Sequence, residues 1–266
     1  MNQAHDIMIK TNHYLIKGGE LTDADKSDIT DKLLAAQSTP EEAKQRFGFR
    51  TRGRDMYPYS YVLPYNGGEK LVTVLNRQPQ TQILSMNSYE LEILRLLNLL
   101  APSNPDVIDM CDKTLVRLKK TCFGGRGCGT GECYETSLVS LRFLSATVPE
   151  DESWMTSLIN TFYTYADKRK RSKYHGQNFS NYYIWYYWLC LSELPYKLAE
   201  QEITHYKDEM LFVAKQGMAM DTVEEKSSTP VKMHILKNCL SRLPGYENSV
   251  VNEKDHRIFL EVSDAT

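Results

Sequence analysis

Two nearly identical six-residue segments occur in this sequence, and each reads as a helix end followed by proline. Residues 190–195 are CLSELP and residues 239–244 are CLSRLP. Looser leucine-rich versions precede Pro102 and Pro149, so that the four prolines follow one another after 47, 46 and 49 residues. This spacing accommodates two helices of about 15 residues each with their connections, as in helical repeat proteins. Because a single helix pair cannot bury its own apolar face, we predict a mainly α-helical fold of stacked antiparallel hairpins, of solenoid or toroid type.

Helix-start and helix-stop signals divide most of the chain into further helices. Thr22 is typical of an N-cap, and Gly18-Gly19 of a helix end. Residues 221–230 are polar and are predicted to form an exposed loop. The predicted helices cover about residues 7–16, 23–37, 40–47, 91–100, 105–120, 133–146, 150–168, 181–194, 198–216 and 231–243.

The region from residue 48 to 85 breaks this helical pattern. An aromatic and β-branched stretch at 57–65 is followed by Asn66-Gly67-Gly68 and then by LVTVL within residues 70–75, an order that predicts a β-hairpin. Residues 257–262 are a further candidate strand for the same small sheet. We therefore expect N-terminal helices over 1–47, a β-containing insertion over 48–85, a helical-repeat region over 86–250 that forms one domain with 1–47, and a C-terminal tail or edge strand over 251–266.

Composition favours a soluble intracellular class of protein. The 266 residues carry 32 Lys+Arg and 34 Asp+Glu, and a net charge of −2 provides no general attraction to nucleic acid or to an anionic membrane. The richest uncharged run, residues 179–192, is shorter than the roughly 18 apolar residues of a membrane-spanning helix. No secretory signal is readable at the N-terminus, and six cysteines are too few for a disulfide framework. We expect a cytoplasmic protein with reduced thiols and no membrane contact.

Residues 122–135, CFGGRGCGTGECYE, form the most unusual segment, because they contain five of the 14 glycines and three of the six cysteines. The glycine N–H groups could bind an anion at the start of the following helix. Cys122, Cys128 and Cys133 could bind a metal ion, with His175 as a fourth ligand, although no C-x₂-C pair is present. The simplest interpretation is a connector whose glycines let two helices approach closely. We therefore expect no metal and no cofactor.

A third hypothesis for this segment is thiol catalysis. Cys133 opens a predicted helix, whose dipole would favour a thiolate nucleophile. His175 could act as the base, and Glu135 lies close by in the sequence. A thiol-dependent acyl-transfer enzyme is therefore one alternative function.

Basic and aromatic residues suggest where a partner could bind. Basic side chains gather in an early loop and after the helix ending near residue 168, and the second group precedes an aromatic helix. Proteins that bind single-stranded nucleic acids combine basic and aromatic side chains in this way. We expect a helical scaffold that binds a protein or peptide partner, with nucleic-acid binding as a further alternative. The candidate binding residues are Arg50, Arg52, Arg54, Arg126, Lys168, Arg169, Lys170, Arg171, Tyr183 and Trp185.

Overall fold

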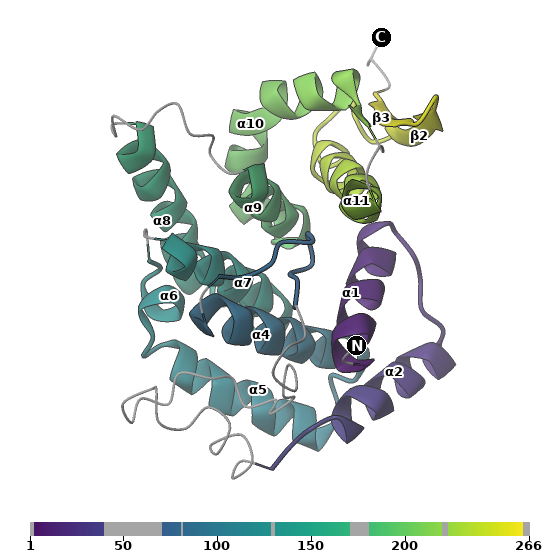
Figure 1. Cartoon of the computed structure of the whole chain (residues 1–266). Helices are drawn as coiled ribbons and strands as arrows, with labels where there is room; N and C mark the ends of the chain where they lie inside the picture. Colours follow the sequence, from purple (N-terminus) through teal and green to yellow (C-terminus); the bar gives the residue numbers. More distant parts are fainter. Residues whose placement is uncertain are drawn as a thin grey trace. The chain divides into compact units, whose positions relative to one another are not determined.

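The computed structural model describes residues 3–39, 71–80, 82–128, 131–170, 181–219 and 223–262, and these are mainly helical with one small antiparallel sheet (Figure 1). The chain divides into two compact units. The first unit contains residues 1–12, 20–74 and 78–176, and the second contains residues 13–19, 75–77 and 177–266. In the described part of the chain, no helix is both long and apolar enough to cross a membrane.

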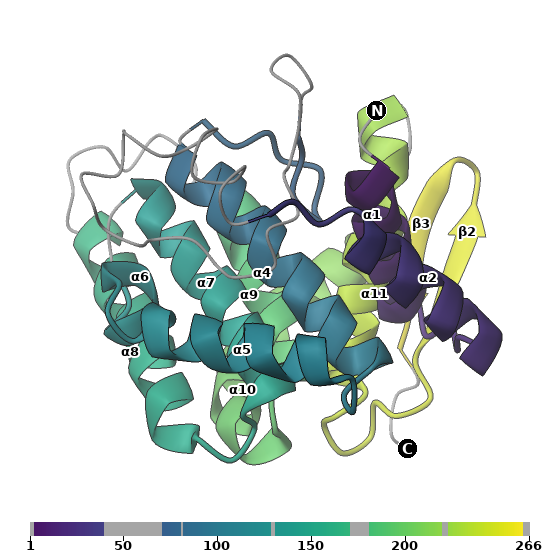
Figure 2. The same cartoon turned by 90° about the horizontal axis from the view of Figure 1, so that it is seen from below.

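The first unit is built around α4 (Gln82–Leu100) and α7 (Gly131–Thr147), which pack against each other (Figure 2). Side chains 87–97 of α4 and 134–144 of α7 are buried on every side, as expected for central helices. An ion pair joins them, with 2.6 Å between Nη1 of Arg142 and Oε2 of Glu92. The surrounding helices are α2 (Asp23–Ala35), α5 (Pro105–Leu118), α6 (Cys122–Gly125) and α8 (Glu152–Lys170).

Local capping sets several helix starts in this unit. The Thr22 hydroxyl accepts from the backbone N–H of Asp25, whose carboxylate accepts in return from the Thr22 N–H, and this capping box begins α2. Asn104 caps α5 through bonds from the N–H groups of Asp106 and Val107, with Pro105 in the first turn. Both starts confirm the sequence-based prediction. Helix α1 (Gln3–Ile16) begins earlier than predicted and ends before Gly18, as expected.

The second unit contains α9 (Asn181–Glu193), α10 (Tyr196–Gln216) and α11 (Val223–Leu240), with α9 packed against both of the others. Its sheet has the order β1-β3-β2, formed by β1 (Met218–Ala219), β2 (Val250–Lys254) and β3 (Arg257–Glu261). The β2–β3 hairpin turns through Asp255 and His256, which both have positive φ. Ile258 and Leu260 face the core.

Two predictions for the β structure need correction. Residues 71–75 are not a strand: Leu71, Val74 and Leu75 are buried in irregular chain, and Nε2 of His5 lies 2.9 Å from the Val72 carbonyl oxygen. A histidine of α1 thus satisfies a backbone group that a neighbouring strand would otherwise bond. The predicted strand at 257–262 is confirmed as β3, but it pairs with β1 and β2. Residues 40–70, including the predicted helix 40–47 and the strand at 57–65, lie outside the described residues.

Several helices extend beyond their predicted ends, and α4 begins at Gln82 instead of residue 91, within the predicted β-containing insertion. Residues 223–230 belong to α11 instead of a loop, and the helix continues through Pro230. Ser228 and Thr229 are buried there, so tertiary packing offsets the backbone hydrogen bond that proline removes. Lys168, Arg169 and Lys170 form the end of α8, where the sequence predicted a loop.

Candidate metal centre

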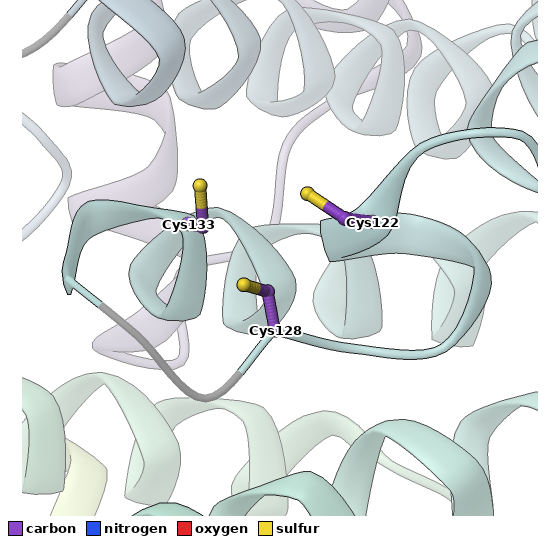
Figure 3. Close-up of side chains that lie close together, drawn as sticks. All are labelled: Cys122, Cys128 and Cys133. Carbon is purple, nitrogen blue, oxygen red and sulfur yellow. The ribbon is translucent and has the colours of Figure 1, made fainter.

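Three cysteine thiols meet between α5 and α7 in the first unit (Figure 3). Cys122 is the first residue of α6, Cys128 lies in the loop after it, and Cys133 is in the first turn of α7. Their sulfur atoms all lie within 4.8 Å of one another. Among the described residues, this thiol cluster is the only group of three or more His, Cys, Asp or Glu side chains with such spacing.

Hydrogen bonds from neighbouring side chains hold the backbone of this segment. The hydroxyl of Thr121 caps α6 by accepting from the Gly124 N–H at 2.9 Å. The indole N–H of Trp154 on α8 donates to the Gly124 carbonyl at 2.6 Å. Two turns later along α8, the Thr161 hydroxyl donates to the carbonyl of Arg126 at 3.1 Å. The segment is therefore fixed to α8 at two points before it reaches Cys128.

Ser137 of α7 links two of the three cysteines. Its hydroxyl accepts from the backbone N–H of Cys128 at 3.0 Å and donates to the carbonyl of Cys133 at 3.0 Å. Cys128 is thereby tied to the same turn of α7 that carries Cys133. These hydrogen bonds fix the backbone groups of Cys128 and Cys133 next to each other.

Three described glycines in the segment, Gly124, Gly125 and Gly127, have no room for a Cβ atom. Gly125 approaches the carbonyl of Lys119 so closely that a Cβ atom would overlap the backbone oxygen. Gly127 has φ of +72°, and a Cβ atom there would overlap Thr161. The glycines thus allow the close approach that the sequence predicted for a connector, and the result is a tightly packed loop.

Burial and proximity both affect the thiols. Cys122 is exposed, whereas Cys128 and Cys133 are half-buried. Burial, together with repulsion from the neighbouring Cys122 and Cys128 thiolates, raises the pKa of Cys133 to about 12. Burial and repulsion from Cys128 also raise the pKa of Cys122, and its hydrogen bond with Cys133 opposes part of that shift. Without a cation, Cys122 and Cys133 are therefore protonated at neutral pH, which makes Cys133 a weak nucleophile despite its place at a helix start.

The structure brings together Cys122, Cys128 and Cys133, but not Glu135. Glu135 lies two residues after Cys133 in α7, and such residues do not face each other on a helix; its side chain is buried. The predicted base His175 lies outside the described residues, so the catalytic pair with Cys133 stays a prediction.

The predicted binding residues lie on several different elements. Arg126 is exposed beside the thiol cluster, and Trp185 is buried in α9, edge-on to Trp188 with 5.0 Å between ring centres. Lys168, Arg169 and Lys170 lie on α8, and Tyr183 lies on α9. The remaining candidates are outside the described residues: Arg50, Arg52, Arg54 and Arg171.

The sequence contained one signal for the cluster, three cysteines separated by five and four residues in a glycine-rich segment. The sequence alone favours a connector over a metal site, because compact zinc sites usually contain C-x₂-C pairs and this segment has none. The return of Cys122 toward Cys133 depends on α6 and on its contacts with Trp154 and Leu118, and spacing alone does not reveal these.

Comparisons with protein-family models, curated proteins and solved structures find no match to the chain.

Proposed function

We propose that this protein binds a zinc ion through the thiolates of Cys122, Cys128 and Cys133. The observation that supports the proposal is the mutual approach of the three sulfur atoms within 4.8 Å. In a tetrahedral site with Zn–S bonds of about 2.3 Å, two sulfurs lie about 3.8 Å apart. Small side-chain rotations are therefore enough to form the site.

The donor set supports this class of metal. Three thiolates are soft ligands that favour zinc or Cu(I), whereas Mg²⁺ and Ca²⁺ prefer oxygen. Three protein ligands leave a fourth zinc position for water or for another group, and His175 is the residue that the sequence suggested for it. The bound cation would also offset the repulsion among the thiolates and so lower the cost of their ionisation.

The ligands also suggest what the metal does for the fold. Cys122 belongs to α6 and Cys133 to α7, so a shared ion would join two helices on either side of the glycine-rich loop. The contacts of Trp154 and Ser137 hold this loop in place from outside the cluster. Zinc would therefore stabilise the connection between α5 and α7.

Metal content tests the proposal directly. The reduced protein is reconstituted with Zn²⁺, desalted and analysed for bound metal, and Co²⁺ replaces zinc to report thiolate coordination by its visible absorption. We expect one ion per chain in the wild type and its loss in Cys122→Ser, Cys128→Ser and Cys133→Ser. Cys111→Ala is the matched control, because Cys111 is buried in α5 outside the cluster. A wild type that binds no ion, or three variants that retain it, would refute the proposal.

We also propose that the repeated segments mark stacked helical hairpins, at least in the second unit. What supports this is a direct contact between the two CLSxLP segments. The Cys239 thiol donates to the Trp188 carbonyl at 3.2 Å, and the Arg242 guanidinium donates to the carbonyls of Leu191 and Leu194 at 2.5 and 2.7 Å. The arginine of one copy thus satisfies carbonyls at the helix end of the other.

Replacing Arg242 tests the contact between the repeats. Arg242→Met removes both hydrogen bonds, and we expect it to lower the free energy of unfolding by about 2 kcal/mol. Arg257→Met is the control, since Arg257 is exposed and donates to the carbonyls of Gln216 and Gly217, which lie outside the repeated segments. Equal stability of the two variants would argue against the stacked arrangement. Recognition of a protein or peptide partner by such a scaffold stays a prediction.

A further inference from the structure

We infer that the thiol cluster is also a redox switch, in which a hydroperoxide converts Cys122 and one neighbouring cysteine into a disulfide and thereby releases the metal ion. This inference rests on the proposed zinc site. It is supported by two observations, the exposure of Cys122 and the presence of two further thiols within 4.8 Å of it.

Exposure makes Cys122 the thiol that the oxidant reaches first. Cys128 and Cys133 are only half-exposed, and Cys111, Cys190 and Cys239 are buried elsewhere in the chain. Metal coordination keeps the Cys122 sulfur in the thiolate form, which is the form that attacks peroxides. The oxidised sulfur then lies beside either of two thiols that can resolve it.

The reaction balances in two steps. With hydrogen peroxide, the Cys122 thiolate attacks one oxygen, the O–O bond breaks, and a sulfenic acid and hydroxide form. The thiolate of Cys128 or Cys133 then attacks the sulfenic sulfur, the S–S bond forms, and a second hydroxide leaves. Two sulfurs together lose two electrons, the peroxide gains them, and protons from the solvent convert both hydroxides to water.

The disulfide removes two of the three zinc ligands, so the ion leaves. The loop itself does not depend on the metal, because Trp154 and Ser137 hold its backbone through hydrogen bonds. The sulfurs therefore stay close together in the empty site, and a dithiol reductant followed by zinc should restore it. Redox state would in this way control whether α6 and α7 are joined by the ion.

The test uses full-length, zinc-loaded protein and hydrogen peroxide. Released zinc is measured with a chromophoric chelator, and the cysteines are assigned by alkylation and peptide mass spectrometry. We expect one disulfide that includes Cys122 for each zinc released, reduced Cys111, Cys190 and Cys239, and recovery of zinc binding after reduction. Cys111→Ala should release zinc at the wild-type rate.

The outcomes separate the two proposals. A protein that binds no zinc before peroxide is added refutes the zinc site. Zinc that stays bound after peroxide treatment overturns the switch alone. So does zinc loss accompanied by sulfinic acid at Cys122, or by a Cys128–Cys133 disulfide that leaves Cys122 free.

Discussion

Buried ionisable side chains make the stability of this protein sensitive to single substitutions. Glu202 of α10 is 3 % exposed, and burial raises its pKa from the usual 4.5 to about 7. The Tyr187 hydroxyl of α9 donates to its carboxyl group at 2.7 Å. Tyr206, whose own pKa is raised by burial and by Glu202, lies nearby. The second unit therefore contains a carboxyl group that titrates near neutral pH.

We expect Glu202→Gln to stabilise the protein at pH above about 7. Because the folded pKa lies above the unfolded one, ionisation of Glu202 favours unfolding progressively between pH 4.5 and about 7, and the penalty persists at higher pH. The variant should gain up to about 3 kcal/mol in the free energy of unfolding at pH 8 and little at pH 4.5. Urea unfolding at both pH values measures the effect. Glu200→Gln, at an exposed position of the same helix, is the control, and equal gains in both variants would contradict the prediction.

Breaking the ion pair between Glu92 and Arg142 should destabilise the protein, in contrast to the replacement of Glu202. Both side chains are almost fully buried, so Arg142→Met leaves a buried carboxylate without this cation. We expect a loss of about 3–5 kcal/mol in the free energy of unfolding. The double variant Glu92→Leu/Arg142→Met should recover most of that loss, because no charge then remains at either position. A double-mutant cycle in urea measures the coupling, and additive losses would show that the pair does not act as a unit.

Among the elements, some are determined by local hydrogen bonds, whereas the loop between α6 and α7 is determined by tertiary contacts. Thr22 and Asn104 begin their helices through bonds within three residues, and such starts can be predicted from sequence. The α6 loop instead depends on Trp154 and Thr161, which lie 30 and 35 residues from the groups they contact. Sequence therefore identified the glycines and cysteines of the loop but not their arrangement.

Gly127→Ala should weaken zinc binding through this loop. Alanine is strained at φ of +72° and its Cβ atom would overlap Thr161, so the segment that carries Cys128 must move. We expect zinc affinity to fall about tenfold or more. Gly18→Ala is a matched control, because Gly18 also has positive φ but has open space around it. Competition with a chelator of known affinity measures both variants, and equal affinities would contradict the prediction.

At the level of the whole chain, we expect zinc to change the thermal stability of the two compact units differently. The thiol cluster belongs entirely to the first unit, so zinc should stabilise that unit in particular. Zinc at about 100 times its Kd should contribute about 2.7 kcal/mol. The tryptophans report each unit, since Trp154 lies in the first and Trp185 and Trp188 lie in the second.

Fluorine NMR of protein labelled with 5-fluorotryptophan can follow the unfolding of each unit during heating. We expect zinc to raise the melting temperature of the Trp154 signal and to leave the signals of Trp185 and Trp188 unchanged. Cys133→Ser should abolish the zinc effect. A common shift of all three signals would show that the units unfold together and would refute their independence.

The helical class of the fold, the capped starts of α2 and α5 and the strand at 257–261 were predictable from sequence, because capping bonds and alternating apolar residues act over a few positions. Tertiary contacts governed the rest. Val72 lies beside His5 instead of a strand, α11 continues through Pro230, and Cys122 approaches Cys133. Each of these features depends on buried contacts between groups that are distant along the chain. The free energy of such contacts exceeds local conformational preferences, and the contacts produce no periodic pattern in the sequence.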